Sequence, residues 1–465
     1  MNTPTSTDIT AAQIEETIGE PVSSVAGMVS SPTGIRERPA AAVAGPLAWL
    51  RANLFSTWLS SAVTILLGYL IIRYAISFID WSLVNAIWHV PSLADGRPDS
   101  SACINAKGTG ACWAVIGDKW RFILFGFYPY DEQWRPTIAM ILFVGLYALS
   151  ANRRMWRREL ALIWIGVLAV IGVLMWGQPV SLAGGAWAIG TVIAVVGALV
   201  LVLMAVAAVF PPLSRSARTI RAACSAIGLG LIALIAIMMS GALFNLTYVA
   251  QDQWGGLPLT LILATFGLAF AFPLAVMVAL GRRARSLPAV KTLCIVYVEL
   301  IRGVPLISLL FMASVMFPLF LPNGINIDKL LRAQIAIILF AAAYLAEVVR
   351  GGLQALPKGQ YEAADALGLS YWQKTGLIIL PQALRLVIPP LVNTFIGFFK
   401  DTSLVLIIGL FDLLTSGKAA VADAPWQAFA TEVYIVLAVI YFLFCFAMSR
   451  YSRGLESEFN RSRTR

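Results

Sequence analysis

The feature that most constrains this chain is a series of apolar runs, each close to the length that crosses a lipid bilayer. Ten such runs can be bounded by charges, prolines or glycines. A membrane-spanning helix needs about 20 mostly apolar residues. The runs therefore predict an all-α polytopic membrane protein with about ten transmembrane helices. They lie at about 56–79, 136–150, 160–176, 186–210, 224–248, 257–280, 304–321, 333–349, 386–410 and 431–449.

The composition agrees with this prediction and excludes a cytosolic enzyme. The chain has 465 residues, of which 59% are hydrophobic and only 12% are charged, whereas soluble proteins carry about 25% charged residues. A single core stops growing beyond roughly 250 to 300 residues, so a soluble fold could not bury this much apolar sequence. Lipid is therefore the expected solvent of most of the chain.

The basic residues alternate between the two sides of the predicted helices. Of the 34 lysines and arginines, 24 fall on one side and 8 on the other, while Arg73 and Lys400 lie inside runs. Basic loops stay in the cytoplasm, so we expect both termini to be cytoplasmic. The net charge of +10 then reports topology rather than nucleic-acid binding.

Two of the parts outside the runs are a leading tail and one long external loop. Residues 1–50 hold no apolar run before a small-residue cleavage site, which predicts a disordered tail and not a signal peptide. The loop at 80–135 contains the only histidine, His89, with Cys103 and Cys112. Outside the cytoplasm these cysteines can form a disulfide, and two free thiols are the alternative. One histidine and no cysteine cluster argue against a metal site.

A polar stretch at 351–385 interrupts the apolar pattern on the predicted cytoplasmic side. It enters a helix-forming segment after Pro357 and leaves it at Gly368. By itself this is compatible with a solvated loop. Its spacing, however, resembles the E-A-A-x3-G-x9-I-x-L-P loop of bacterial ATP-binding-cassette importer permeases. The matching positions include Glu362, Ala363, Ala364, Gly368 and Pro381.

Further stretches resemble the polar amino acid subgroup of that family, at 297–306, 346–351 and 400–404. The resemblance covers about 257–450 and implies a type I importer permease core made of the last five spans. In the family the loop is the coupling helix that docks on a cytoplasmic ATPase, with Glu362 available to a basic group of that partner. Stretches at 110–114 and 125–136 also resemble the long subunit of general L-amino-acid permeases.

The resemblance implies a division of the chain and a set of partners. We expect a cytoplasmic tail at 1–50, a transmembrane extension at 51–256 with its periplasmic loop, the core at 257–450 with the coupling loop, and a cytoplasmic tail at 451–465. The implied partners are an ABC ATPase dimer, a second permease subunit in a heterodimer, a periplasmic amino-acid-binding protein, the amino acid and membrane lipid. No nucleic acid is expected.

Ionisable residues inside the membrane are costly and become functional candidates. Lys400 and Asp401 lie deep in the ninth run, about 22 Å past Arg385 at 1.5 Å per residue. With Asn393, they could line a cavity that meets the ammonium and carboxylate of an amino acid. A helix-packing ion network that never touches substrate is the alternative.

Two further charged pairs are spaced i, i+3 near the predicted cytoplasmic interface. They are Glu299 with Arg302 and Glu347 with Arg350. Residues three apart on a helix lie on one face. We expect these pairs to be structural, closing a gate region or anchoring the coupling loop.

The sequence also lacks an ATP site of its own. A phosphate-binding loop needs G-x-x-x-x-G-K-[ST], and the only Gly-Lys pair, Gly417-Lys418, departs from it. We therefore expect a transporter subunit that is not an enzyme, has no cofactor, and depends on ATP bound by a partner. It would import polar or general L-amino acids across the bacterial inner membrane by alternating access. The alternatives are an ion-coupled secondary transporter, with Asp401, Glu347 or Glu299 as proton carrier, and a polytopic membrane enzyme.

Overall fold

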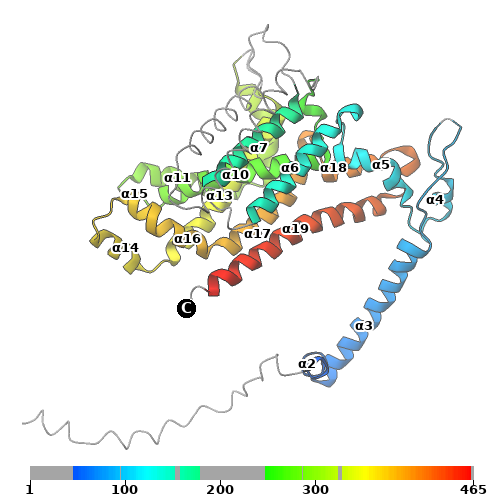
Figure 1. The fold of residues 1–465 in the computed structure, drawn as a ribbon, viewed down its shortest axis with the longest axis horizontal. Helices are drawn as coiled ribbons and strands as arrows, with labels where there is room; N and C mark the ends of the chain where they lie inside the picture. Colours follow the sequence, from blue (N-terminus) through cyan, green and yellow to red (C-terminus); the bar gives the residue numbers. More distant parts are fainter. Residues whose placement is uncertain are drawn as a thin grey trace, which may run out of the picture. The chain divides into compact units, whose positions relative to one another are not determined.

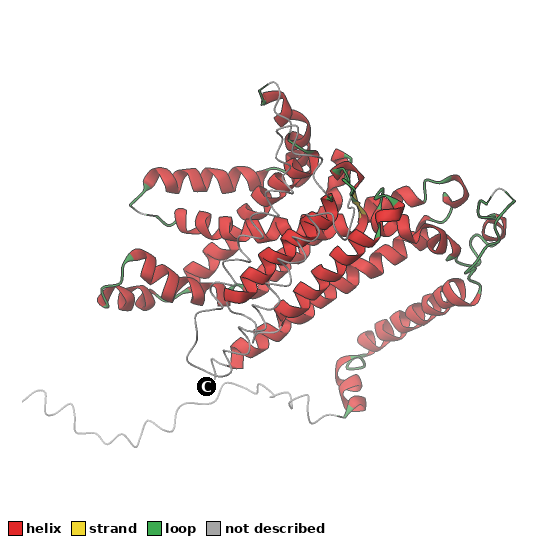
Figure 2. Ribbon diagram, turned by 45° about the horizontal axis from the view of Figure 1, so that its top comes forward, coloured by secondary structure: helices red, strands yellow, loops and turns green. Residues whose placement is uncertain are grey.

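The chain is helical almost throughout its described part (Figure 2). The computed structural model describes residues 45–94, 96–151, 158–177, 247–284, 286–322 and 327–461. Contacts divide the chain into two units, Met1–Ile79 and Asp80–Arg465. The predicted all-α class is confirmed. The predicted runs at 186–210 and nearly all of 224–248 lie outside the described residues, so the count of ten spans is not confirmed.

The first unit contributes helices α2 (Pro46–Asn53) and α3 (Trp58–Ile79) (Figure 1). Within the first unit no residue of α3 is buried. The guanidinium of Arg73 donates to the hydroxyl of Ser77, 2.6 Å away. This contact gives the charge of Arg73 a polar partner on its own helix.

Six helical segments of the described chain are long and apolar enough to cross a membrane: Trp58–Val84, Tyr130–Ala151, Gly256–Gly281, Lys329–Ala355, Ile388–Ile408 and Ala430–Ser457. A seventh is possible if a bent helix pair counts as one span. The principal helices of the second unit are α4 (Ser101–Asn105), α5 (Ala114–Phe125), α6 (Trp134–Ala151), α7 (Arg158–Trp176), α10 (Gly256–Gly281), α11 (Pro288–Gly303), α12 (Leu306–Phe311), α13 (Lys329–Ala355), α14 (Lys358–Ala366), α15 (Tyr371–Gln373), α16 (Leu380–Leu386), α17 (Ile388–Asp401), α18 (Leu413–Ala420) and α19 (Ala430–Arg461). Shorter 3-10 or π-helical segments are η1 (Asp80–Val84), η2 (Tyr130–Glu132), η5 (Gln251–Gln253), η6 (Met312–Met316), η7 (Phe317–Phe320), η8 (Lys374–Ile379), η9 (Thr402–Ile408) and η10 (Ala424–Trp426). A short strand, β1, is Phe411–Asp412.

The predicted run at 304–321 contains the helical segment Leu306–Phe320, which follows a sharp bend. Helix α11 and the segment Leu306–Phe320 meet at 104°. Val304 is extended, with φ −110° and ψ 133°, because a residue before proline is driven out of the helical region. Pro305 then begins the next helix, so the apolar run starts at a sharp bend rather than continuing α11.

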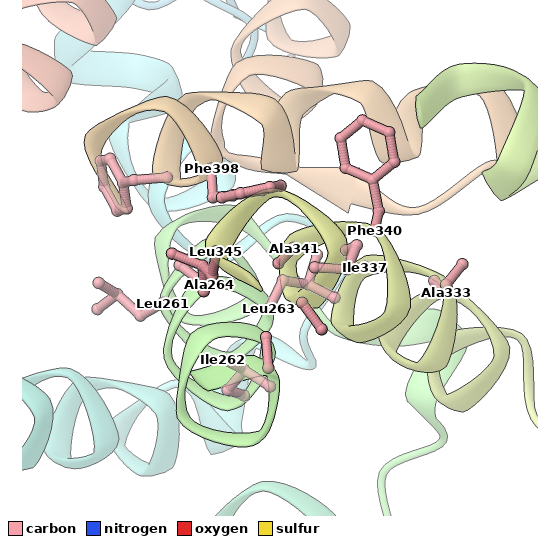
Figure 3. Packing of buried hydrophobic residues seen from close by; sticks show 14 of the residues in the cluster. Leu261, Ile262, Leu263, Ala264, Ala333, Ile337, Phe340, Ala341, Leu345 and Phe398 are labelled. Atoms are coloured by element: carbon pink, nitrogen blue, oxygen red, sulfur yellow. The ribbon is translucent and has the colours of Figure 1, made fainter. Parts of the chain in front are cut away.

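The core is built around α10 and α13, which form the most extensive helix pair of the described residues (Figure 3). Three consecutive alanines, Ala341 to Ala343, are fully buried on α13. Small residues let helix backbones approach closely where lipid offers no hydrophobic driving force. Ile337 lies so near α10 that a Cβ on Gly267 would be 2.9 Å from its Cγ2 atom. Phe398 of α17 covers the same cluster through an edge-to-face contact with Phe340.

The two ends of α10 lie beside different helices and define two ends of the second unit. The first residue of α10, Gly256, lies beside α5 and pairs with Asp412 of β1. We call this the α5 end. The last residue of α10 is Gly281, and two residues later comes Arg283, whose side chain reaches α14. We call this the α14 end.

At the α5 end, the segment before α6 packs on α18 and α19. A disulfide joins Cys103 to Cys112, the pair considered from the sequence. The amide of Cys112 donates to the buried carboxylate of Glu432 on α19, 3.0 Å away. The indole of Trp426 donates to Asp118 at 2.8 Å. Buried Val115, Ile123, Leu413, Trp426 and Leu437 complete an apolar cluster there.

Candidate functional site

The α14 end of the second unit carries the short helix that the sequence singles out. Helix α14 starts after Pro357 and ends at Ala366, with Leu367 as its C-cap residue. Gly368 follows with φ +67°. Its amide donates to the Asp365 carbonyl at 2.9 Å, while the Leu369 amide donates to the Ala364 carbonyl at 3.3 Å. These two bonds form a Schellman motif, which places a left-handed glycine directly after the helix.

The two faces of α14 have different surroundings. Ala364 is only 1% exposed and Tyr361 is half-buried, so this face packs against the rest of the chain. Glu362 and Ala363 are exposed. Of the two alanines that match the family loop, only Ala363 is therefore on the exposed face. Pro381 is exposed in the first turn of α16.

The polar segment begins later than the predicted bound of residue 351. Helix α13 continues through Gly351 and Gly352 to Ala355, so the loop proper begins at Leu356. A Cβ on Gly352 would lie 2.7 Å from the Ala383 carbonyl oxygen, which explains why glycine stands where α16 crosses. Lys374 bonds to Asp365, and the amide of Gln382 donates to Gln360 at 3.1 Å.

Helix α14 is joined to the ends of α10 and α13 by a compact polar contact. The Tyr361 hydroxyl donates to the Leu353 carbonyl at 2.9 Å. The Arg283 guanidinium donates to that same carbonyl and to the Tyr361 hydroxyl, each at 2.8 Å. It also lies 5.2 Å from the centre of the Tyr361 ring. A single arginine thus contacts both the short helix and α13.

A charged cluster lies beside this contact and differs from the two predicted pairs. Glu347 accepts from Arg350 at 2.6 Å, as the i, i+3 spacing predicts. Glu299 instead meets Arg282, with 3.1 Å between Oε1 and Nη2. Arg282 also bonds to Glu347.

The predicted pairing of Glu299 with Arg302 is therefore wrong. Arg302 turns toward α13, where it lies 3.9 Å from Glu347 and 5.3 Å from the centre of the Tyr344 ring. A cation over an aromatic face is attracted by the ring quadrupole. Arg302 thus has two partners on α13 that its position in the sequence does not reveal.

Sequence reasoning missed several residues at this end of the molecule. In the sequence, Arg282 and Arg283 count only as charges that set topology, yet in the structure they hold α11, α13 and α14. The exposed apolar residues Leu367 and Trp372, the latter 74% exposed, were also missed. The available signal was two adjacent arginines directly after an apolar run, and an aromatic pair, Tyr371-Trp372, shortly after the glycine stop.

The predicted substrate residues lie on α17. Asn393 and Lys400 are both exposed, and a spacing of seven residues places them on one helix face. Asp401 is partly buried at the C-terminal end of α17. The structure therefore gives Asn393 and Lys400 a shared open face, while their contact with substrate stays a prediction.

A cavity of about 480 Å³ lies elsewhere, between α7, α10 and α13. Its lining is almost wholly apolar, with Gln251 and Gln334 as its polar members. It contains none of the predicted substrate residues and does not suit a zwitterion. Within the described residues, no group of three or more His, Cys, Asp or Glu side chains could hold a metal ion.

Comparison with known proteins places these features in context. Residues 271–461 match the family described as binding-protein-dependent transport system inner membrane component. The chain is 42% identical over 418 residues to the inner membrane amino-acid ABC transporter permease protein YhdY of Escherichia coli, covering 90% of this chain and 94% of that protein. It is 41% identical over 429 residues to the glutamate/glutamine/aspartate/asparagine transport system permease protein BztC of Rhodobacter capsulatus, with the same coverage.

Shorter relatives and one solved structure match the second half of the chain. The probable glutamine ABC transporter permease protein GlnP of Bacillus subtilis is 33% identical, over 44% of this chain and 91% of that protein. A solved structure titled "Crystal structure of an amino acid ABC transporter with histidines" is 30% identical, covers 44% of this chain and 92% of that chain, and gives a TM-score of 0.39.

Proposed function

The chain belongs to the amino-acid ABC transporter permeases, and from this premise we propose that it is the long permease subunit of an importer for polar L-amino acids. The identity of 42% over 90% of the chain carries the proposal. In the same proposal, the chain divides into a transmembrane extension at 51–256 and a transport core at 257–450. The relative of similar length that is named for glutamate, glutamine, aspartate and asparagine supports acidic amino acids and their amides as the substrate class.

The mechanism follows from the α14 end. Family membership implies association with an ATPase and a binding protein. In our proposal an ATPase dimer, which binds ATP for a chain that has no cofactor of its own, meets the exposed face of α14 at Glu362 and Ala363. The neighbouring apolar residues Leu367 and Trp372 extend this surface. Displacement of α14 then switches the core between states open to the periplasm and to the cytoplasm.

In the substrate pathway, the open face of α17 supplies the polar contacts. Lys400 would meet the substrate carboxylate and Asp401 its ammonium, with Asn393 about two turns away on the face of Lys400. A second permease subunit would complete the cavity, because both exposed polar side chains point away from this chain's own core. The binding protein would deliver substrate at the α5 end.

Uptake by the reconstituted complex tests the proposal. Proteoliposomes holding this chain with its ATPase, second permease and binding protein should accumulate labelled glutamate or glutamine only when ATP is supplied on the side that carries the ATPase. Lys400→Met should weaken uptake at least tenfold, whereas Lys291→Met, an exposed cation on α11, should not. Uptake by this chain alone under an ion gradient would instead establish the secondary-transporter alternative.

The orientation is a separate part of the proposal. We place the protein in the bacterial inner membrane with both termini and α14 in the cytoplasm and residues 80–135 in the periplasm. A fluorescent protein that folds only in the cytoplasm should fluoresce when it is fused after Arg465. An alkaline phosphatase inserted at Gly108 should be active. The reverse pattern would contradict the assigned topology.

A further inference from the structure

We propose that Arg282 and Arg283, two adjacent residues at the end of α10, transmit the displacement of α14 to the charged cluster between α11 and α13. We call this pair the arginine junction. The inference rests on the proposed function, because it explains how a partner's movement of α14 reaches the transport core. Neither residue contacts substrate in this reading, so both are positioning residues.

The first step is the contact from α14 to the junction. Tyr361 is on the inner face of α14, one turn from buried Ala364. Its hydroxyl and the Leu353 carbonyl both accept from the same Nη1 atom of Arg283, each at 2.8 Å. The hydroxyl also donates to that carbonyl. Three groups, from α13, from α14 and from the turn after α10, thus bond pairwise, so α14 cannot shift without straining or breaking a bond to Arg283.

The second step is the contact from the junction to the cluster. Arg282 is the residue next to Arg283 and caps the C-terminal end of α10. Its side chain is only 11% exposed and bonds to Glu299 of α11 and Glu347 of α13. Glu347 in turn holds Arg350 at 2.6 Å and lies 3.9 Å from Arg302. Three arginines share two carboxylates, so any movement of Arg282 redistributes the partners of the other four charges.

The third step is the rigidity of the connection. Adjacent residues share a peptide plane, so displacement of the Arg283 backbone moves that of Arg282 as well. Helix α10 continues from this point into the tightly packed pair with α13. Close-packed helices have discrete arrangements and do not deform continuously, so a shift at the junction is passed on as movement of whole helices.

The experiment compares transport with ATP hydrolysis in the assembled complex. We expect Arg283→Met and Tyr361→Phe to retain binding-protein-stimulated ATP hydrolysis within about twofold of wild type while substrate moved per ATP falls at least fivefold. Arg283→Lys should be intermediate, because one ammonium cannot reproduce the planar fork of donors. Lys291→Met, which removes an exposed cation of α11, is the matched control and should keep the wild-type ratio.

The outcomes separate this inference from the proposed function. Absence of ATP-dependent uptake in the wild-type complex would overturn the proposed function and this inference with it. Normal wild-type uptake, with an unchanged ratio of transport to hydrolysis in both Arg283→Met and Tyr361→Phe, would overturn the junction alone. If Arg283→Met fails to assemble with the ATPase, the test rests on Tyr361→Phe, which loses only one hydroxyl. A reduced ratio of transport to hydrolysis in Tyr361→Phe supports the junction, and a wild-type ratio overturns it.

Discussion

At the scale of single residues, Lys119 shows how α5 is held to the turn before α19. Its ammonium lies 2.7 Å from Asp423 and 3.2 Å from Asp118. Asp118 also accepts from the Trp426 indole. The hydrogen bond from Lys119 holds the pKa of the Asp423 carboxyl below its usual range. Two segments about 300 residues apart in sequence are thereby joined by one cation.

This contact predicts a small, pH-dependent stabilisation. Because the folded state lowers the pKa of Asp423, its ion pair stabilises the fold above the ordinary value of 3.8 and is lost as pH falls below it. The Asp423 side chain is 49% exposed, so screening limits the effect to less than about 1 kcal/mol. Thermal unfolding should show Asp423→Asn slightly less stable than wild type at pH 7, with the difference vanishing as the pH falls below 3.8. A difference that persists in acid would contradict this origin.

At the scale of elements, α14 depends on its terminal glycine. Gly368 adopts φ +67° and its surroundings are open, so a side chain would be strained by the backbone alone. A left-handed conformation costs an ordinary L-residue about 1–2 kcal/mol. Gly368→Ala should therefore destabilise the end of α14 by that amount and reduce co-purification of the ATPase severalfold. Gly368→Asn should be milder, because asparagine tolerates this conformation.

The same helix provides a control for that prediction. Gly359 lies inside α14, where a Cβ would meet nothing within 4 Å and the backbone φ is not positive. Replacing it by alanine should stabilise the helix by about 0.5–1 kcal/mol. If Gly359→Ala reduces ATPase binding as strongly as Gly368→Ala, the turn after α14 is not the cause.

The elements also show what the sequence could and could not reveal. Turn chemistry predicted the start of α14 after Pro357 and its end at Gly368, because these residues have restricted or unusual backbone conformations. The inward position of Ala364 was not predicted, since it depends on which side η8 packs. Nor was the partner of Glu299, because i, i+3 spacing finds neighbours on one helix and Arg282 comes from another.

The bend between α11 and α12 was missed for a related reason. A membrane span is predicted from the length and the apolar character of a run, and the run beginning at Val304 is both long and apolar enough. A proline inside such a run is interpreted as a kink within a span, whereas Pro305 begins a new helix at 104° to α11. For α17, the structure shows Asn393 and Lys400 both exposed, while their contact with substrate stays a prediction.

At the scale of the whole second unit, the C-terminal end of α5 and the start of α10 are in close backbone contact at the α5 end. Gly256 begins α10 with φ +65°, and a Cβ there would lie 1.9 Å from the Leu124 carbonyl oxygen. Gly126 and Gly255 also approach each other closely, since a Cβ on Gly126 would lie 2.7 Å from the Gly255 Cα atom. Only residues without side chains allow α5 and α10 to meet in this way.

Replacing Gly256 by alanine should therefore destabilise the fold of the second unit. Backbone strain and overpacking together should cost about 2–5 kcal/mol, measured as a lower midpoint of thermal unfolding of the purified protein in detergent. Gly145→Ala on α6, where a Cβ meets nothing within 4 Å, should change stability by less than about 1 kcal/mol. Equal losses in both variants would show that glycine content, rather than this contact, matters.

The bond from the Cys112 amide to Glu432 joins residues 320 positions apart, and this has a consequence for biosynthesis. A ribosome adds about 5–20 residues per second, so Glu432 follows Cys112 by roughly 16–64 s. During that interval the loop bearing Cys112 has been made, but α19, which covers it, has not. The disulfide lies within the early segment and can form without α19. It can therefore hold the loop in shape until the last helix is inserted and completes the structure.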